Sequence, residues 1–375
     1  MKVSIPKEKN DFERRVSVTP DVVQSLIKSG FEVYVEKDAG LNSYFSNDAY
    51  EKAGAKILSD TTIYSDADVV LKVNAPSPSE ISWMKKGSVL ISMMYAATNP
   101  EVVEACAKAG VNSFSMDAIP RISRAQKMDV LSSQANLAGY KAVLIGAAAL
   151  GKIFPLLMTA AGTIKPSKVV IMGAGVAGLQ AIATAKRLGA IVEVSDIRPE
   201  TKEQVESLGG KFIQLKNDDS VQLEGGYVKG VSDEFLKMQQ ELIAKHISEA
   251  DLVITTALIP GRKAPILVTD EMVKSMKMGS VIVDMAVGQG GNCTMSEVNK
   301  TVVKNGVTII GESNLPSLLP LNASELYAKN IQAFLLHLAT KDGFKWEMEE
   351  EITKGSLITY NGEAVHLSTI KPVTN

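Results

Sequence analysis

The segment from Lys168 to Asp196 holds the residues of this chain whose types and spacing point most directly to chemistry. A short apolar run that ends at Met172 leads into Gly173-Ala174-Gly175-Val176-Ala177-Gly178 and then into a helical pattern. In a strand–turn–helix unit, the first glycine permits a tight turn, the second lets backbone N–H groups approach a pyrophosphate, and the third lets the helix pack close to the strand. The helix N-terminus also favours phosphate charge. The pattern therefore predicts a dinucleotide-binding turn.

A second apolar run, Ile191–Ser195, ends at Asp196, about 20 residues beyond the turn, where an acidic side chain accepts hydrogen bonds from the adenosine ribose. Its charge would repel the 2′-phosphate of NADP, so the sequence favours NAD(H). Arg198 leaves an alternative open, because an arginine near this position can pair with such a phosphate. Otherwise Arg198 is a solvated loop charge.

Strand-like and helical patterns alternate along the chain, which predicts parallel sheets, because parallel strands need long crossover connections. The first series of strands is Lys2–Pro6, Phe31–Glu36, Asp68–Asn74, Ser88–Met94 and Val111–Met116. The second series is Lys168–Met172, Ile191–Ser195, Lys211–Leu215, Asp251–Thr256, Ser280–Ala286 and Val307–Gly311. Since the pattern restarts, we expect an α/β fold with two doubly wound, Rossmann-like domains and a cleft between them.

The elements between and after these series set the expected domain limits. Ser132–Leu150 reads as one long helix that bridges the domains, and Ser324–Thr340 as a helix that packs back on the first domain. Ser356–Leu367 alternates around Asn361-Gly362, which is typical of a β-hairpin. Thr19 is expected to cap a helix that starts at Pro20. The expected domains are residues 1–132 plus 317–375, and an NAD(H)-binding domain of residues 133–316.

Composition narrows the possible functions. The 375 residues are 45% hydrophobic and 22% charged, with a formal net charge of −2, which is ordinary for a globular protein and disfavours nucleic-acid partners. Cys106 and Cys293 have no metal-ligand spacing, so we expect no metal, no disulfide framework and a reducing compartment.

No secretory leader is visible. Ala142–Gly162 is apolar, but Lys152 and Pro155 interrupt it, which favours a buried helix plus loop over a membrane span.

A dehydrogenase of an amino or 2-oxo acid moves a proton as well as a hydride, and histidine is the usual acid/base near pH 7. The chain has three histidines, His246, His337 and His366. Since none precedes residue 246, residues 1–132 offer no imidazole to a cleft. We interpret each histidine as a surface or packing residue.

Three further segments carry a family resemblance: Ile5-Pro6-Lys7-Glu8, Arg15 to Pro20, and Leu71-Lys72-Val73. Together with the glycine turn they resemble the alanine dehydrogenase and transhydrogenase superfamily. Alanine dehydrogenases use an Arg and a Lys, matched here by Arg15 and Lys72, plus a His and an Asp. At those last two places this chain has Tyr95 and Gly288, so the proton-transfer pair is missing. Arg15 and Lys72 then read as inherited structural or cleft-lining charges.

The other branch of the superfamily fits over longer stretches. These are Pro120–Asp129, Leu131–Gln134, Met158–Thr163, Gln180–Ala190, Thr201–Gly210 and Thr255–Gly261. They are similar to the NAD(H)-binding component, the soluble domain I of the alpha subunit, of proton-translocating nicotinamide nucleotide transhydrogenases. The resemblance implies the reaction NADH + NADP⁺ ⇌ NAD⁺ + NADPH, with NADP(H) held on a partner domain. The nucleotide contacts expected from motif and resemblance are Gly173, Gly175, Val176, Ala177, Gly178, Asp196, Ile197, Arg198, Thr256, Ala257 and Leu258.

The resemblance also implies residues that align the two nicotinamide rings. Arg121, Gln126 and Asp129 match a family loop that does this, and Ser132 matches a serine that follows it. These residues come after a predicted strand, at the edge of the sheet where ligands collect. The alternative is a solvated loop with a helix cap at Asp129.

A second loop, Lys216–Ser232, is long and lacks periodicity, which suggests a lid. Its Tyr227 matches a tyrosine of a mobile loop in the family. A disordered insertion without a role is the alternative.

The resemblance further implies a homodimer that works with NADP(H)-binding and membrane-spanning subunits. The chain ends at Asn375 without membrane helices or a second nucleotide domain, so we expect those parts on other subunits, unless the sequence is a fragment. We expect a cytoplasmic protein, peripheral on the cytoplasmic face of the inner membrane through its partners. Two alternatives stay open: an alanine-dehydrogenase-like oxidoreductase, and a non-catalytic NAD(H)-binding module.

Overall fold

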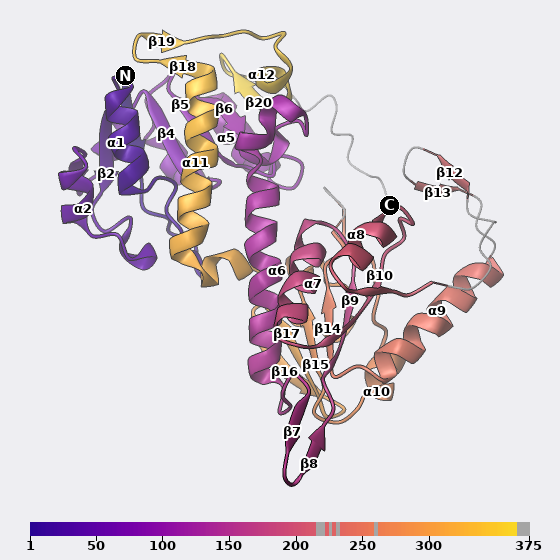
Figure 1. Ribbon diagram of the computed structural model, residues 1–375. Helices are drawn as coiled ribbons and strands as arrows, with labels where there is room; N and C mark the ends of the chain where they lie inside the picture. The colour runs from indigo at the N-terminus through magenta and orange to yellow at the C-terminus, as the bar shows by residue number, and fades with distance from the viewer. Residues whose placement is uncertain (215–221, 225–226, 230–232, 259–261, 366–375) are drawn as a thin grey trace. The chain divides into compact units, whose positions relative to one another are not determined.

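The computed structural model describes residues 1–214, 222–224, 227–229, 233–258 and 262–365. The chain divides into two compact units, Met1–Gln134 with Pro316–Asn375, and Ala135–Leu315. Each unit is described by itself (Figure 1).

The first unit is built on an eight-stranded sheet in the order β21-β20-β6-β5-β4-β1-β2-β3. Its strands are β1 (Lys2–Ile5), β2 (Glu32–Glu36), β3 (Lys56–Leu58), β4 (Val69–Asn74), β5 (Val89–Met93), β6 (Asn112–Ser115), β20 (Leu357–Tyr360) and β21 (Glu363–Ala364). All pairings from β3 to β6 are parallel, whereas β20 runs antiparallel to β6 and to β21. The predicted hairpin around Asn361-Gly362 is therefore confirmed, and it extends the sheet.

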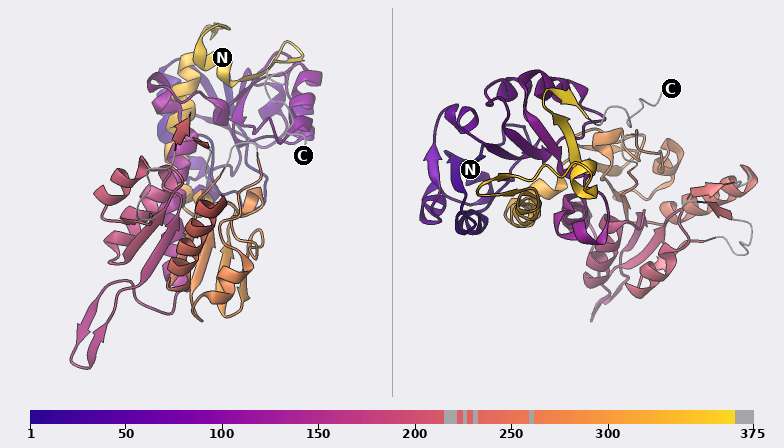
Figure 2. Two further views of the ribbon diagram at one scale, coloured as in Figure 1. Left: turned by 90° about the vertical axis from the view of Figure 1, so that its right-hand side faces the viewer. Right: turned by 90° about the horizontal axis from the view of Figure 1, so that it is seen from above.

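Side chains of the central strands alternate between two apolar cores, one on each face of this sheet. Val69, Leu71 and Val73 of β4 belong to one core, and Val70 to the other. Helices α1 (Pro20–Lys28), α2 (Asn47–Lys52) and α11 (Pro320–Leu338) cover the first face (Figure 2). Helices α3 (Thr62–Ser65), α4 (Pro78–Ser82) and α5 (Pro100–Ala109) cover the second. The expected return of α11 onto the first unit is thus confirmed.

The remaining elements of the first unit are short. They are η1 (Leu41–Ser43), η2 (Met116–Ala118), η3 (Ser123–Met128), α12 (Glu351–Ser356) and the hairpin of β18 (Ala339–Thr340) and β19 (Gly343–Phe344). A short helix, η5 (Leu315–Leu318), spans the boundary at Pro316 between the two units.

The second unit is built on a seven-stranded sheet in the order β11-β10-β9-β14-β15-β17-β16. Its strands are β9 (Lys168–Met172), β10 (Ile191–Ser195), β11 (Lys211–Phe212), β14 (Leu252–Thr255), β15 (Val281–Asp284), β16 (Lys300–Lys304) and β17 (Val307–Gly311). All pairings are parallel except that of β16 with β17. Strand β9 begins the series, with β10 on one side and β14 on the other. This reversal is the mark of a doubly wound sheet, so the expected α/β fold class is confirmed.

Helices connect the strands of the second unit. They are α6 (Val130–Ala149), which starts in the first unit, α7 (Val176–Arg187), α8 (Thr201–Ser207), α9 (Asp233–Ser248), α10 (Asp270–Ser275) and η4 (Val287–Gln289). Two hairpins complete the unit, β7 (Leu157–Thr159) with β8 (Gly162–Ile164), and β12 (Gln222–Glu224) with β13 (Tyr227–Lys229). Within the described ranges, no helix has both the length and the apolar character that a membrane crossing requires.

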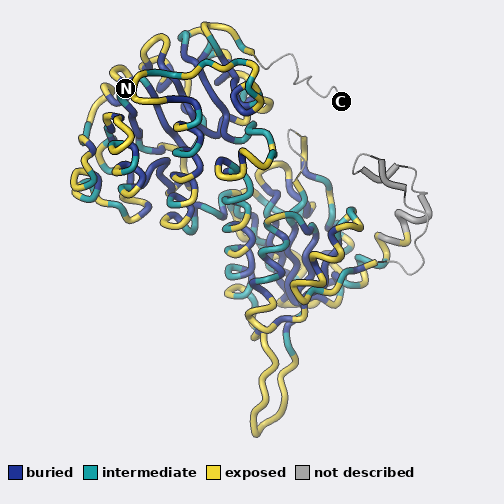
Figure 3. Tube along the Cα trace, turned by 45° about the horizontal axis from the view of Figure 1, so that its top comes forward, coloured by how far each residue is buried: buried dark blue, intermediate teal, exposed yellow. Residues whose placement is uncertain are grey.

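Four local expectations were wrong or incomplete. Strands β3 and β16 were missed because they are edge strands with mostly exposed or half-buried side chains, which leave no apolar run to recognise. The loop expected after α6 instead forms the β7–β8 hairpin, whose residues are all exposed (Figure 3). Thr19 does precede α1, but its side chain makes no capping hydrogen bond.

Close backbone contact between α6 and α7 gives a testable prediction. A Cβ on Gly139 of α6 would lie 2.0 Å from the carbonyl oxygen of Ala177, and backbone cannot move aside easily. Gly139→Ala should therefore lower the free energy of unfolding by about 1–3 kcal/mol despite alanine's higher helix propensity. Gly146→Ala, in the same helix, is the matched control, because its obstacle is the flexible side chain of Leu252. Urea unfolding in which Gly139→Ala is no less stable than the parent would contradict this packing.

Candidate functional site

The glycine turn joins β9 to α7, and close contacts require glycine at two of its three glycine positions. Gly173 has φ +110°, and a Cβ there would lie 2.3 Å from Thr256 Oγ1. A Cβ on Gly178 would lie 1.9 Å from the carbonyl oxygen of Gly173, so the helix packs directly on the strand end. Beside Gly175, in contrast, a Cβ would meet open space. The turn therefore leaves room for a ligand at Gly175, where the first N–H groups of α7, including those of Val176 and Ala177, lack helical partners.

Asp196 follows β10 and lies beside this turn. Its Oδ2 accepts a hydrogen bond of 2.6 Å from Ala174 N–H, which fixes the carboxylate against the turn. Arg198 donates from Nε to Oδ1 and from Nη2 to Oδ2, each at 3.0 Å. Burial by itself would raise the pKa of Asp196, but these bonds with Arg198 and Ala174 hold that pKa below its usual value. The carboxylate is thus charged at neutral pH, and Arg198, whose side chain is 41% exposed, is its ion-pair partner. Ile197, between them, is exposed.

The segment after β14 lies against the opposite side of the turn. Thr256 donates its N–H to the carbonyl of Met172, and its Oγ1 lies 3.2 Å from the carbonyl oxygen of Gly173. Ala257 is half-buried and Leu258 is exposed. The structure therefore brings together the three groups of predicted nucleotide contacts in the second unit, which follow β9, β10 and β14.

The predicted alignment loop belongs to the first unit. Arg121 and Gln126 are exposed, whereas Ala125 and Met128 of η3 are buried in the core that contains α11. Asp129 accepts hydrogen bonds from the N–H of Ser132 at 2.8 Å and from its hydroxyl at 2.6 Å. Asp129 thus caps α6, as the structural alternative expected, and such a cap contributes about 1 kcal/mol.

Asn330 of α11 fixes this loop and was missed from the sequence. Its Nδ2 donates to the carbonyl of Lys127 at 2.8 Å, and its Oδ1 accepts from the hydroxyl of Ser133 at 2.7 Å. Arg124 also forms an ion pair with Glu350, which precedes α12. The sequence held no direct signal of these contacts, because the partners lie about two hundred residues apart. The one related prediction was that α11 packs on the first unit.

Some of the predicted lid lies outside the described residues. These are residues 216–221, 225–226 and 230–232, and the side chain of Tyr227 is also not described. His366 likewise lies outside the described residues. His246 lies 2.6 Å from Glu193 and His337 lies 3.0 Å from Glu350, so both are half-buried packing residues that pair with carboxylates. Among the described residues, no cluster of His, Cys, Asp and Glu side chains is arranged to hold a metal.

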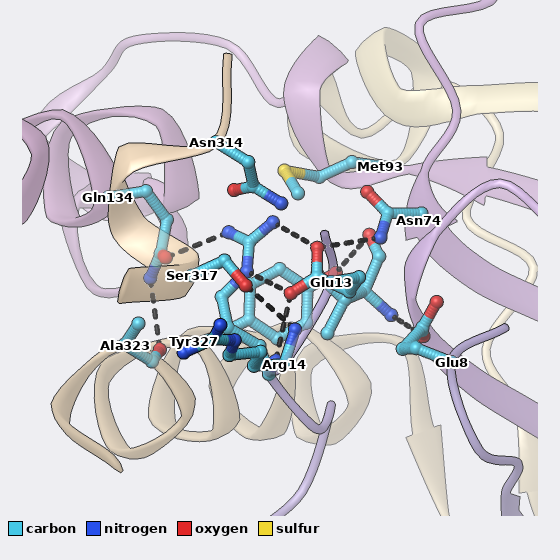
Figure 4. Close-up of polar contacts among 12 residues, drawn as sticks. Glu8, Glu13, Arg14, Asn74, Met93, Gln134, Asn314, Ser317, Ala323 and Tyr327 are labelled. Carbon is cyan, nitrogen blue, oxygen red and sulfur yellow. Dashed lines mark hydrogen bonds and ion pairs between the residues drawn. The ribbon is translucent and has the colours of Figure 1, made fainter. Parts of the chain in front are cut away.

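Arg15 and Lys72 lie in buried charge clusters of the first unit (Figure 4 shows the cluster around Glu13). Arg15 donates from Nε and Nη2 to the two carboxylate oxygens of Glu13, at 2.8 and 2.7 Å, and from Nη1 to Gln134 Oε1. Burial by itself would raise the pKa of Glu13, but Arg15 and then Asn74 lower it to about 2. Lys72 Nζ lies between the carboxylates of Glu8 and Glu80, 3.4 and 3.5 Å away. Such pairing is what the interpretation of Arg15 and Lys72 as structural charges requires.

Tyr95 and Gly288 lie at the two positions where the family resemblance places the proton-transfer pair of an alanine dehydrogenase. Tyr95 has φ +45° and lines a cavity of about 240 Å³ in the first unit with Asn10, Asn74 and Met93 among its neighbours. A tyrosine phenol ordinarily has a pKa near 10, which does not suit proton exchange at pH 7. Gly288, in the second unit, belongs to η4 and offers no side chain.

Known proteins resemble this chain over nearly its whole length. The family model described as Alanine dehydrogenase/PNT, N-terminal domain, matches residues 4–138, and the model for the C-terminal domain matches residues 142–367. A Rhodospirillum rubrum protein, named as the first portion of NAD(P) transhydrogenase subunit alpha, is 49% identical over 98% of each chain. The crystal structure of the transhydrogenase from Sinorhizobium meliloti is 46% identical, with a TM-score of 0.90 over 97% of this chain and 100% of that chain. Alanine dehydrogenase of Bacillus subtilis is 34% identical over 98% of this chain and 93% of its own length.

Both halves of the chain thus match one family in order, and the identity is higher with a transhydrogenase alpha subunit than with an alanine dehydrogenase. The chain belongs to the alanine dehydrogenase/PNT family, and its fold is shared with a solved transhydrogenase.

Proposed function

We propose that this chain is the NAD(H)-binding component of a proton-translocating NAD(P)⁺ transhydrogenase. NADH bound here would pass a hydride directly to NADP⁺ on a partner subunit, while membrane-spanning subunits couple the reaction to proton movement. The observation that carries the proposal is the turn at Gly173–Gly178, where open space beside Gly175 and the N-terminus of α7 adjoin the carboxylate of Asp196. The name of the Rhodospirillum rubrum relative, a transhydrogenase alpha subunit, supports it.

The residues of the turn suit a dinucleotide. The N–H groups at the start of α7 and the helix dipole would hold a pyrophosphate, and the space beside Gly175 admits it. Asp196 would accept hydrogen bonds from the hydroxyls of the adenosine ribose. Because Ala174 and Arg198 already hold the carboxylate, it is oriented before the nucleotide arrives.

The role proposed for the first unit is alignment of the reacting ring. Hydride transfer between two nicotinamides needs no acid or base at the site, only near-attack geometry with water excluded. Arg121 and Gln126 have exposed polar groups for this purpose on a loop whose end is fixed by Asp129 and Ser132. A non-catalytic NAD(H)-binding module would have no use for such a loop. A stand-alone alanine-dehydrogenase-like enzyme would need proton-transfer groups where Tyr95 and Gly288 stand.

We also infer that the chain acts as a homodimer with NADP(H)-binding and membrane-spanning subunits. That arrangement would place it on the cytoplasmic face of the inner membrane. The subunit name of the Rhodospirillum rubrum relative supports partners of this kind.

The charge of Asp196 predicts cofactor preference. Purified protein should bind NADH at least about tenfold more tightly than NADPH, equivalent to about 1.4 kcal/mol, because the carboxylate repels a 2′-phosphate. Arg198→Ala should widen this preference, since it removes the cation that partly offsets the carboxylate. Calorimetric titration that finds equal affinities for the two nucleotides would rule out Asp196 as the selecting group.

The residues at positions 95 and 288 predict the absence of one activity. Oxidation of NADH that depends on pyruvate and ammonia should stay at the background rate, since neither position offers a proton-transfer group. An alanine dehydrogenase assayed in parallel serves as the positive control. Robust turnover by this chain would favour the alanine-dehydrogenase-like function instead.

The alignment loop predicts a rate defect without a binding defect. When the chain is mixed with an NADP(H)-binding transhydrogenase domain, Gln126→Asn and Arg121→Ala should slow hydride transfer about tenfold or more. NADH affinity should stay within a few fold of the parent value. Lys127→Ala is the matched control, because Lys127 is an exposed side chain of the same loop without a proposed alignment role. If both variants transfer hydride at the parent rate under saturating conditions, the loop is structural.

A further inference from the structure

Asp284 is a fully buried carboxylate at the carboxyl end of β15. It accepts hydrogen bonds from the N–H groups of Ala286, Asn292 and Cys293 at 3.0–3.2 Å. Two hydroxyls, those of Thr255 at 3.1 Å and Ser296 at 2.6 Å, complete the set. Because three of these five donors are backbone groups, the buried charge fixes the path of the turn that follows β15.

Asn292 lies on this turn and is itself fully buried. Its Oδ1 accepts from Ala257 N–H at 3.1 Å, and its Nδ2 donates to the carbonyls of Ala257 at 2.9 Å and Pro265 at 2.7 Å. Its own carbonyl accepts from the N–H groups of Leu267 and Val268. One side-chain amide therefore pairs with both polar groups of Ala257 and fixes the orientation of that residue.

This pairing decides how Ala257 can meet a ligand. Since its N–H is bonded to Asn292 Oδ1 and its C=O accepts from Asn292 Nδ2, Ala257 has no free backbone donor, and it offers a ligand its methyl group and the second lone pair of its carbonyl. Leu258, next in the chain, has a side chain that is 49% exposed. Thr256, on the other side, is tied to the glycine turn. The segment is thus held at the turn with an apolar surface.

Sheet topology indicates which half of a dinucleotide this surface meets. Strand β9, which leads into the turn, lies between β10 and β14. Asp196, at the end of β10, is on the side expected to bind the adenosine ribose. A dinucleotide that crosses the turn at its pyrophosphate extends toward β14 on the other side. Ala257 and Leu258 follow β14, so they lie on the side of the nicotinamide riboside.

We propose that Asn292, held by Asp284, is a positioning residue that fixes Ala257 and Leu258 for apolar contact with the nicotinamide riboside half of the dinucleotide. This inference rests on the proposed function, in that the turn at Gly173–Gly178 binds NAD(H).

The test compares two ligands. ADP carries the adenosine and both phosphates of NADH but not the second riboside. Asn292→Asp keeps the size of the side chain but removes the two donors to Ala257 and Pro265. It should weaken NADH binding about tenfold and leave ADP binding within about twofold, as measured by calorimetric titration, because the adenosine contacts do not depend on Asn292.

Two further variants separate positioning from loss of stability. Val307→Ala removes buried volume at the amino-terminal end of β17, the opposite edge of the sheet from Ala257, and should leave the ratio of NADH to ADP affinity unchanged. Leu258→Ala alters an exposed side chain, so it should fold normally, and it should weaken NADH binding several fold but not ADP binding. If Asn292→Asp does not fold, Leu258→Ala tests the apolar contact that Asn292 is proposed to position, and unchanged NADH affinity in that variant overturns the proposal.

The outcomes are distinct. The positioning role is wrong, while nucleotide binding stands, if Asn292→Asp leaves NADH affinity unchanged. It is also wrong if Asn292→Asp or Leu258→Ala weakens the binding of NADH and the binding of ADP equally. If the parent chain binds neither ADP nor NADH, the proposed function itself fails and the role of Asn292 falls with it.

Discussion

The second unit depends on one close backbone approach, between Gly178 at the start of α7 and the carbonyl of Gly173 at the end of β9. A Cβ at position 178 would overlap that carbonyl oxygen, at 1.9 Å, so only glycine permits the contact. The contact places the first turn of α7 over the end of the central strand. As a result, the N–H groups that the helix cannot pair internally face the open space at Gly175.

Two other elements pack against the residues that surround this contact. The hydroxyl of Thr256 lies so close to Gly173 that a Cβ on Gly173 would also be excluded. This contact holds the end of β14 at the turn. Helix α6 packs through Gly139 on the carbonyl of Ala177, in the first turn of α7. Gly139 and Gly178 thus bring backbone segments into direct contact, and Gly173 admits the Thr256 hydroxyl, so the turn is closely packed.

The sequence was informative where one local pattern determines one structure. The limits of β9, β10 and β17 agree with those expected from their apolar runs, because these strands are mostly buried and end at, or just before, a glycine or polar residue. The glycine spacing likewise predicted the turn. Contacts between distant segments were not predictable, since nothing near Asn330 signals that its amide meets Lys127. The pairing of Asn292 with Ala257 escaped for the same reason, because it depends on how two loops pack after their strands have formed.

Glu13 in the first unit and Asp284 in the second are buried carboxylates that are held in different ways, and the difference matters for what each can do. In the first unit, Glu13 pairs with Arg15, and Glu8 and Glu80 share Lys72, so the buried carboxylates are held by cationic side chains; burial raises the pKa of Glu8. Removing one member of such a pair costs about 3–5 kcal/mol, which makes the cluster a strong constraint on how side chains pack. In the second unit, Asp284 is held by three backbone N–H groups and two hydroxyls.

A carboxylate bonded to the main chain fixes the loop itself. The turn after β15 must keep its N–H groups directed at Asp284, and this requirement in turn directs Asn292 at Ala257. The path of the chain, rather than a reactive side chain, is what these bonds preserve. This suits a site whose chemistry is carried by the bound dinucleotide, because the protein then contributes mainly through the accuracy with which its backbone holds that ligand.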